Sequence, residues 1–177
     1  LGRELAAAMD ELGVLHDLSH LSQRATDELL AATDRTVIAS HSNCRALLGG
    51  ETNEAWQRHL ADETIREIGR RGGVIGLNLV RNFIAWSEGA TPETLGRPSI
   101  DRAIAHVERI CELTGSRAHV GLGSDMDGGI TANDLPAGID APTDLHKLSD
   151  ALRASAWSES EIEGFERGNW LRVLRER

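Results

Sequence analysis

Four short apolar runs constrain the fold of this chain more than any other feature of its sequence. Each has the length of a β-strand, and valine and isoleucine recur in them. Their near-continuous apolar character is typical of parallel strands that are covered on both faces. A helical pattern follows each of the first three, and this alternation predicts an α/β fold with a parallel sheet. The runs are GVLHDL (13–18), TVIAS (36–40), VIGLNLV (74–80) and AHVGLG (118–123).

The helices expected around these strands are marked by apolar spacing and by residues that begin or end a helix. Gly13 ends a first helix, and Ser22 is placed to cap a second. Ser158 and Glu161 fit a capping box near the end of the chain. A loop rich in glycine, aspartate and proline is expected at 124–142. The predicted helical ranges are 1–12, 22–33, 53–71, 100–114, 143–154 and 158–177.

Two α/β architectures accommodate four strand–helix units. A doubly wound sheet can be complete at 177 residues, whereas a (β/α)8 barrel needs about 250 residues. Leu1 stands where an initiating methionine is expected, and it already lies within a helical pattern. We therefore expect residues 1–177 to be a single-domain fragment. Its predicted fold is the C-terminal half of a (β/α)8 TIM-type barrel, with about four βα units followed by C-terminal helices.

Composition and charge exclude several classes of function. The net charge is −9 and no basic face is evident, so nucleic acid is not an expected partner. No stretch approaches the ~18 consecutive apolar residues of a membrane span, and no signal-peptide pattern is present, which favours a cytoplasmic location. Cys44 and Cys111 are isolated, which predicts buried free thiols rather than a disulfide framework or a thiolate zinc site.

Chemically capable side chains follow three of the four runs, and functional residues of parallel α/β folds collect at the C-terminal ends of strands. His20 and His41 each come after a serine at the end of an apolar run. Neighbouring strands lie ~4.8 Å apart, so two neutral imidazoles there can share one zinc ion. His16 lies inside the first strand and is expected to pack in the core. Asn78 is expected to be a buried, hydrogen-bonded amide.

Asp125 and Asp127 follow the fourth run in the stretch GLGSDMDGG. A calcium-binding loop needs glycine and glutamate where this chain has Ile130 and Pro136, so that interpretation fails. An aspartyl phosphatase of the haloacid dehalogenase type would use the two aspartates as nucleophile and general acid, but leaves both histidines unexplained. Asp127 can also simply form a turn. Asp125 is nearer to the strand and is the better candidate for a base or a carboxylate beside a metal.

Taken together, the stretches LGVLHDLSHLS, VIASHSN, VGLGSDMDGG and GNWLRVL resemble the membrane (renal) dipeptidase family of zinc peptidases. The resemblance runs in order along the chain. It implies a (β/α)8 barrel with two zinc ions and hydrolysis of dipeptides, including those with a C-terminal D-residue. It assigns His20 and His41 to one of the zinc ions and Asp125 to the catalytic aspartate. The family's other zinc ligands belong to earlier strands, which this chain does not contain.

Two departures from the family pattern bear on activity. The family has an arginine before an asparagine shortly after the second histidine, and this arginine binds the substrate carboxylate. Here Thr52 precedes Asn53, and Arg45 is displaced; the loop over 80–99 is also longer than usual in the family. The sequence therefore predicts a metallodipeptidase that takes a dipeptide as its substrate. A homodimer is a candidate assembly of the intact protein. This fragment by itself is expected to be inactive. The alternatives are a dipeptidase-like barrel that has lost peptidase activity and acts in binding, and an Asp-x-Asp phosphatase that uses Asp125.

Overall fold

The sheet is built from parallel strands that follow one another in chain order. β1 pairs with β2 and β3 pairs with β4, and a bridge between Ala39 and Ile75 joins the two pairs. Neighbours in this order are the expected product of repeated βα units. The computed structural model describes residues 1–49, 56–86, 94 and 96–175. Its strands are β1 (His16–Asp17), β2 (Val37–Ile38), β3 (Ile75–Leu77) and β4 (Val120–Leu122).

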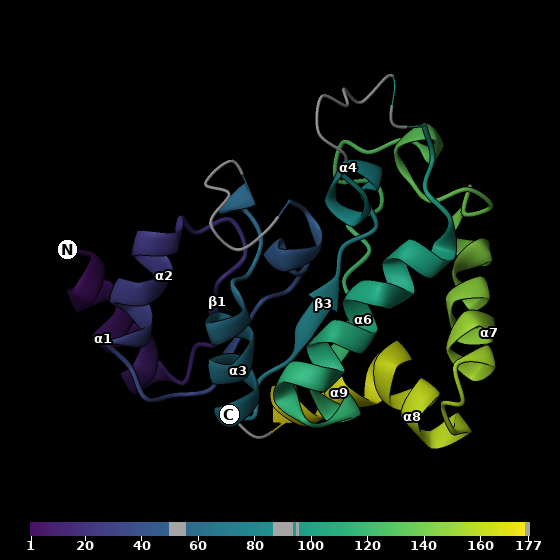
Figure 1. Cartoon of the computed structure of the whole chain (residues 1–177). Coiled ribbons are helices and arrows are strands. Elements are labelled where there is room, and N and C mark those ends of the chain that lie inside the picture. The colour runs from purple at the N-terminus through teal and green to yellow at the C-terminus, as the bar shows by residue number, and fades with distance from the viewer. Residues whose placement is uncertain (50–55, 87–93, 95, 176–177) are drawn as a thin grey trace.

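Helices connect the strands and flank them (Figure 1). In chain order, α2 lies between β1 and β2, α3 between β2 and β3, and α6 between β3 and β4. A π-helical turn over Gly164–Gly168 joins the last two helices. The helices are α1 (Gly2–Leu12), α2 (Gln23–Leu30), α3 (Asp62–Arg70), α4 (Arg81–Ile84), α6 (Ile100–Thr114), α7 (His146–Ala154), α8 (Glu159–Glu163) and α9 (Asn169–Arg175).

Local capping accounts for several of the helix boundaries that the sequence predicts. Gly13 adopts the left-handed conformation (φ 67°) that ends α1. The Ser22 side chain accepts a hydrogen bond from the backbone N–H of Ala25, which satisfies one free donor at the start of α2. Ser158 and Glu161 form the expected capping box at the start of α8. These ends are confirmed because each depends on residues that are close in sequence.

The helix predicted over 53–71 is wrong at its start, because α3 begins only at Asp62. Residues 53–55 lie outside the described part of the chain. Leu60 forms a parallel bridge with Cys44. The backbone N–H of Leu60 donates a hydrogen bond to the carbonyl of Asn43, and the carbonyl of Leu60 accepts one from the N–H of Arg45. Backbone groups bonded to a distant segment cannot also make intrahelical bonds. The apolar residues Trp56 and Leu60, whose spacing suggested a longer helix, therefore lie in a turn and at the bridge that follows it.

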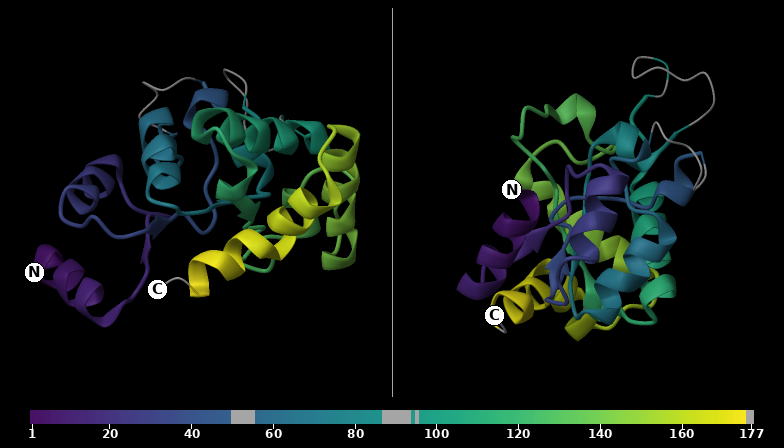
Figure 2. Two further views of the ribbon diagram at one scale, coloured as in Figure 1. Left: turned by 90° about the horizontal axis from the view of Figure 1, so that it is seen from below. Right: turned by 90° about the vertical axis from the view of Figure 1, so that its left-hand side faces the viewer.

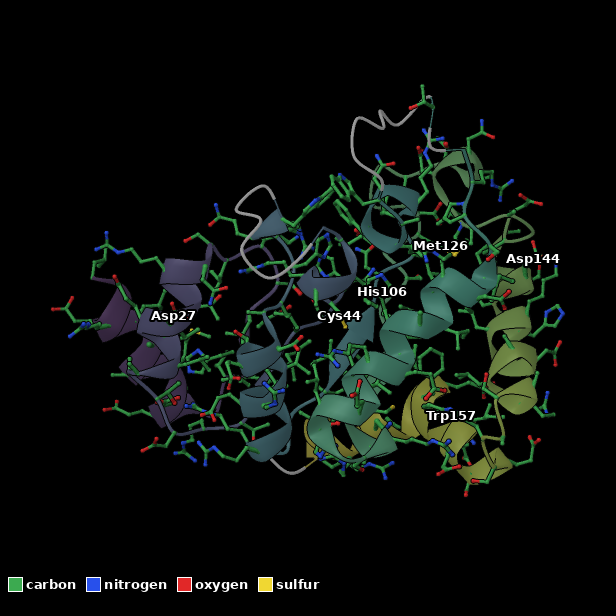
Figure 3. The ribbon with its side chains drawn as sticks, in the orientation of Figure 1. Asp27, Cys44, His106, Met126, Asp144 and Trp157 are labelled. Carbon is green, nitrogen blue, oxygen red and sulfur yellow. The ribbon has the colours of Figure 1, made fainter. Side chains whose placement is uncertain are left out.

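The hydrophobic core fills the space between the strands and helices α3, α6, α7 and α8. α6 packs against α3 on one side and α7 on the other (Figure 1). On its inner face, fully buried His106 accepts a hydrogen bond at Nδ1 from Cys44 N–H and hydrogen-bonds the carbonyl of Ile84 through Nε2 (Figure 3). Burial lowers the pKa of His106 to about 4, so α6 carries a neutral imidazole into the core.

The end of β2 approaches β3 and β4 so closely that two glycines are required there. A Cβ added at Gly76 would lie 1.9 Å from the carbonyl oxygen of Ser40, and a Cβ added at Gly123 would lie 2.0 Å from the same oxygen. Neither position leaves room for a methyl group. The backbone just before His41 is therefore seated against β3 and β4, which fixes where His41 leaves the sheet.

The first two helices lie apart from α7 and α8. α1 and α2 are at one end of the molecule, and α7 and α8 are at the other (Figure 1, Figure 2). His16 in β1 is 3% exposed and hydrogen-bonds through Nε2 to the Asp10 carboxylate of α1 at 2.8 Å. Burial opposes ionisation of Asp10, but its hydrogen bonds with His16 and Thr33, together with nearby positive charge that includes Arg35, outweigh burial and lower the pKa of Asp10. His16 therefore holds α1 against the sheet, as its expected packing role requires.

Candidate active site

His20 and His41 lie opposite each other just beyond the C-terminal ends of β1 and β2. In the parallel pairing of β1 with β2, His16 lies opposite Val37, which is 21 residues further along the chain. His41 is also 21 residues after His20, so the same register places these two histidines opposite each other. The two Nε2 atoms are 2.8 Å apart and the ring centroids 4.8 Å apart. His20 has a left-handed backbone (φ 68°), which turns the chain sharply after the strand. The predicted histidine pair is thus brought together by parallel pairing of neighbouring strands.

Short hydrogen bonds tie the two histidine-bearing loops to each other. One carboxylate oxygen of Asp17 accepts from the backbone N–H groups of Ser19 and Ser40, both at 2.9 Å. The hydroxyl of Ser19 accepts from His41 N–H at 3.0 Å. Nδ1 of His41 is hydrogen-bonded to Ser40 Oγ at 2.6 Å. The hydrogen bond between Ser40 and Nδ1 fixes the orientation of the His41 ring and leaves its Nε2 directed at His20.

Arg58 brings a positive charge to the histidine pair. Nη1 donates to Ser42 Oγ at 2.8 Å and Nη2 donates to the His41 carbonyl at 2.9 Å, while Nη2 lies 3.5 Å from His20 Nε2. Burial lowers the pKa of Arg58, although the guanidinium remains a cation at neutral pH. Burial also lowers the pKa of His41, and the Arg58 charge lowers it further. The neutral imidazole is the form that binds a metal ion.

Sequence reasoning missed Arg58. The family pattern places the arginine shortly after the second histidine, where this sequence has Thr52, a residue outside the described part of the chain. The available signal was that Arg58 is the first arginine after Arg45. The predicted helix over 53–71 hid it, because a position on a helix would not have been associated with the strand ends.

Asp125 lies at the turn that follows β4 and accepts a hydrogen bond at Oδ2 from Asn78 Nδ2 at 3.0 Å. Its charge acts on the pKa of His41 and on that of Arg58, in both cases raising it. Asn78 is fully buried and hydrogen-bonded, as predicted. Asp127 is exposed and has a left-handed backbone (φ 65°), which fits a turn residue.

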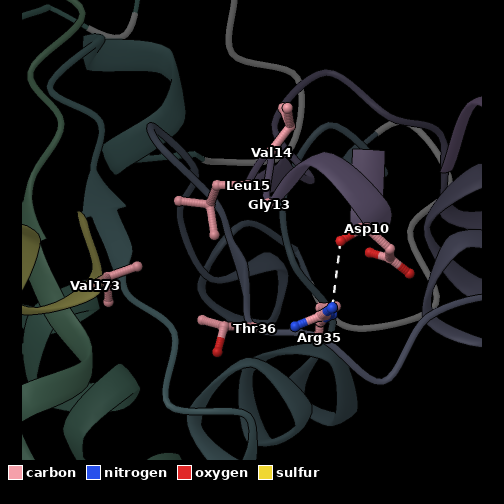
Figure 4. Close-up of a pocket in the computed structure, with 7 residues that line it drawn as sticks. All are labelled: Asp10, Gly13, Val14, Leu15, Arg35, Thr36 and Val173. Carbon is pink, nitrogen blue, oxygen red and sulfur yellow. Dashed lines mark hydrogen bonds between the residues drawn. The ribbon is translucent and has the colours of Figure 1, made fainter. Parts of the chain in front are cut away.

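The arrangement therefore combines two imidazole donors, a guanidinium cation and a carboxylate. Within the described ranges, no group of three or more His, Cys, Asp or Glu side chains is placed to hold a metal ion. A pocket of about 100 Å³ lies elsewhere, at the N-terminal ends of β1 and β2 (Figure 4). It is lined by Asp10, Gly13, Val14, Leu15, Arg35, Thr36 and Val173 and includes none of the predicted site residues.

Parallel strands that carry histidines and a carboxylate at their C-terminal ends define an α/β protein typical of metal-dependent hydrolases. The chain belongs to the membrane dipeptidase family, peptidase family M19, whose sequence profile matches residues 1–177. This confirms the resemblance that the four sequence stretches suggest.

The curated relatives and solved structures are longer proteins. The chain is 34% identical to an uncharacterized dipeptidase of Schizosaccharomyces pombe over 177 residues, covering 97% of this chain and 38% of the relative. It is 27% identical to Dipeptidase 3 of Mus musculus over 175 residues, covering 99% of this chain and 32% of the relative. A metallopeptidase of Rhodobacter sphaeroides, solved with a phosphinate mimic of the dipeptide L-Ala-D-Ala, matches with a TM-score of 0.83 and 28% identity. That match covers 98% of this chain and 45% of the solved one, so the chain spans less than half the length of each.

The same comparisons support the α/β fold, which resembles part of the M19 metallopeptidase structures. Among the helices in the described part of the chain, none has the length and apolar character needed to cross a membrane.

Proposed function

We propose that this chain supplies part of the active site of a zinc-dependent dipeptidase and forms the C-terminal half of a (β/α)8 barrel. The observation that carries the proposal is the cluster of His20, His41 and Arg58, with Asp125 close enough to act on its charges. Family membership and the likeness to a metallopeptidase bound to a dipeptide mimic support it.

The donor set fits part of a zinc site. Nε2 of His20 and Nε2 of His41 approach each other, while Ser40 engages the other ring nitrogen of His41. Catalytic zinc sites typically take three protein ligands, so further ligands would come from outside this histidine pair. A zinc ion bound there would activate a water molecule and polarise the amide carbonyl of a dipeptide. The resemblance to two-zinc enzymes implies a second ion beside it.

Arg58 and Asp125 are the proposed groups for the two charged ends of a dipeptide. The guanidinium of Arg58 can bind a carboxylate through two parallel hydrogen bonds. Asp125 would hold the substrate ammonium group or move a proton at its carboxylate. Because Arg58 supplies the cation, the absence of an arginine at Thr52 no longer argues for a barrel that has lost peptidase activity. The phosphatase alternative loses support because Asp127 is exposed in a turn.

We further propose that the 177 residues alone bind zinc weakly and hydrolyse dipeptides slowly, because two ligands are too few for a complete centre. The test measures zinc affinity by calorimetry for the parent, for His41→Ala and for a control, His146→Ala, whose side chain is exposed and hydrogen-bonds to the carbonyl of Thr143. We expect His41→Ala to bind at least tenfold more weakly and the control to match the parent. Unchanged affinity in His41→Ala would refute the zinc assignment, and rapid dipeptide hydrolysis by a monomer of this chain would refute the half-site proposal.

A further inference from the structure

Two buried asparagines connect the histidine pair to Asp125. Asn43 comes two residues after His41, and Asn78 directly follows β3; both are 0% exposed. We propose that these residues set the position of Asp125 relative to the histidines, with Asn78 as the positioning residue that holds the carboxylate. The inference rests on the proposed function, because it takes Asp125 to act on the substrate beside the histidines.

Asn43 bonds to the backbone of Asn78 much as a neighbouring strand would. Its Oδ1 accepts from Asn78 N–H at 3.0 Å, and its Nδ2 donates to the carbonyl oxygens of Asn78 at 3.0 Å and Phe83 at 2.7 Å. Its own N–H donates to His59 Nδ1 at 3.3 Å. Breaking such bonds would leave buried polar groups unpaired, which is costly. The segment that carries His41 is therefore held firmly to the segment that carries Asn78.

The partners of Asn78 allow its side-chain amide one orientation. Oδ1 accepts from Val80 N–H at 2.8 Å, so the NH₂ group faces the other way and donates to Asp125 Oδ2 at 3.0 Å. A flipped amide would set two donors together at Val80 and two acceptors together at Asp125. The backbone of Val80 therefore determines that a donor, and not an acceptor, meets the carboxylate.

Asp125 is a residue for which such a restraint matters. Its backbone lies in the left-handed region (φ 59°), which a residue other than glycine rarely adopts. A hydrogen bond to an ionised carboxylate is stronger than one between neutral groups. Successive hydrogen bonds through Asn43 and Asn78 thus link the segment that carries His41 to the carboxylate of Asp125.

The substitution Asn78→Asp tests this inference because it is nearly isosteric. It keeps an acceptor for Val80 N–H and both backbone bonds to Asn43, but it removes the donor and places two carboxylates together. We expect the unfolding equilibrium constant, measured by urea denaturation of the full chain, to rise about tenfold or more. The control Asn133→Asp adds the same charge at an exposed position and should change this constant less than about twofold.

The decisive experiment exchanges the amide at position 78 with the carboxylate at position 125. The double variant Asn78→Asp with Asp125→Asn restores one donor facing one acceptor, with the polarity reversed. We expect it to recover most of the stability lost in Asn78→Asp, to within about threefold of the parent constant. If the exchange is no more stable than the single variant, or if Asn78→Asp behaves like the exposed control, the inference is overturned.

Kinetics with L-Ala-D-Ala separate positioning from a merely structural role. Where the parent turns the dipeptide over, Asn78→Asp should lower kcat about tenfold with KM changed less than about threefold, and the stable exchange variant should stay inactive. In an Asp125→Ala background, adding Asn78→Asp should produce no further loss, since Asn78 acts through Asp125. A further additive loss would contradict the inference. Zinc binding by His41 tests the proposed function separately, and the stability exchange decides the inference whether or not the parent shows turnover.

Discussion

Substitution of Gly76 by alanine should disturb both the fold and the histidine pair. A Cβ at this position would lie 1.9 Å from the carbonyl oxygen of Ser40, 2.8 Å from its carbonyl carbon and 3.0 Å from Gly123 Cα. All three are backbone atoms, so no flexible side chain can move aside. Restoring even a 3 Å separation requires the Ser40 carbonyl to retreat by about 1 Å.

The size of the effect follows from this overlap. Inserting a methyl group into a packed interior costs about 1–3 kcal/mol, and a clash with backbone belongs at the upper end of that range. Ser40 immediately precedes His41 and bonds to its ring, so a shift of about 1 Å also moves Nε2 of His41 away from Nε2 of His20. Zinc–nitrogen distances tolerate only ~0.2 Å, and zinc affinity should therefore fall at least tenfold.

The assay combines urea denaturation with calorimetric zinc titration of Gly76→Ala. The matched control is Gly2→Ala in α1, where an added Cβ meets nothing within 4 Å and the substitution should be neutral or slightly stabilising. Gly123→Ala meets the same Ser40 carbonyl at 2.0 Å, so it should show a loss similar to that of Gly76→Ala. If Gly76→Ala is as stable as Gly2→Ala and binds zinc like the parent, the close approach of β2 to β3 and β4 is refuted.

Three further predictions address the site, the core and a helix end. Arg58→Lys keeps the charge but loses the two-pronged donor. Where the parent turns over L-Ala-D-Ala, the proposed carboxylate contact therefore predicts that KM rises about tenfold with a smaller change in kcat, and an unchanged KM argues against that contact. Burial lowers the pKa of His106 from 6.5 to about 4 in the folded chain. As the pH falls from 6.5 to 4, the His106 imidazole is therefore protonated in the unfolded chain before it is protonated in the folded chain. The free energy of unfolding should fall by about 3 kcal/mol over this range. His106→Gln should remove that part of the pH dependence in denaturation curves, and a profile as steep as the parent's contradicts the assignment. Ser158→Ala removes the cap of α8 and should lower stability by about 1 kcal/mol, measured as Tm; an unchanged Tm would show that the capping box contributes little.

Helices marked by nearby residues could be predicted from the sequence. The range 100–114 matches α6 because its apolar spacing and the left-handed Gly115 (φ 69°) are local features. The apolar runs located all four strands but overstated their lengths, since a residue counts as strand only where a neighbour pairs with it. The start of α3 could not be predicted, because it depends on the bridge between Leu60 and the distant Cys44.

The candidate site was predictable to a similar degree. His20, His41 and Asp125 stand out because each follows an apolar run, and the parallel pairing of β1 and β2 accounts for the meeting of the two histidines. Arg58 could not be found in this way, since it follows no strand. Its place at the site depends on hydrogen bonds to the segment that carries His41.

The sequence by itself determined the alternation of strands and helices, the order of the candidate site residues and the family. These properties depend on apolar periodicity, caps and short motifs, all of which act between residues close in the chain. Only the tertiary structure decided that Arg58 faces the histidines and that Asn78 holds Asp125, 47 residues further on. Such contacts are set by packing and by the need to pair buried polar groups, which no local pattern of residues records.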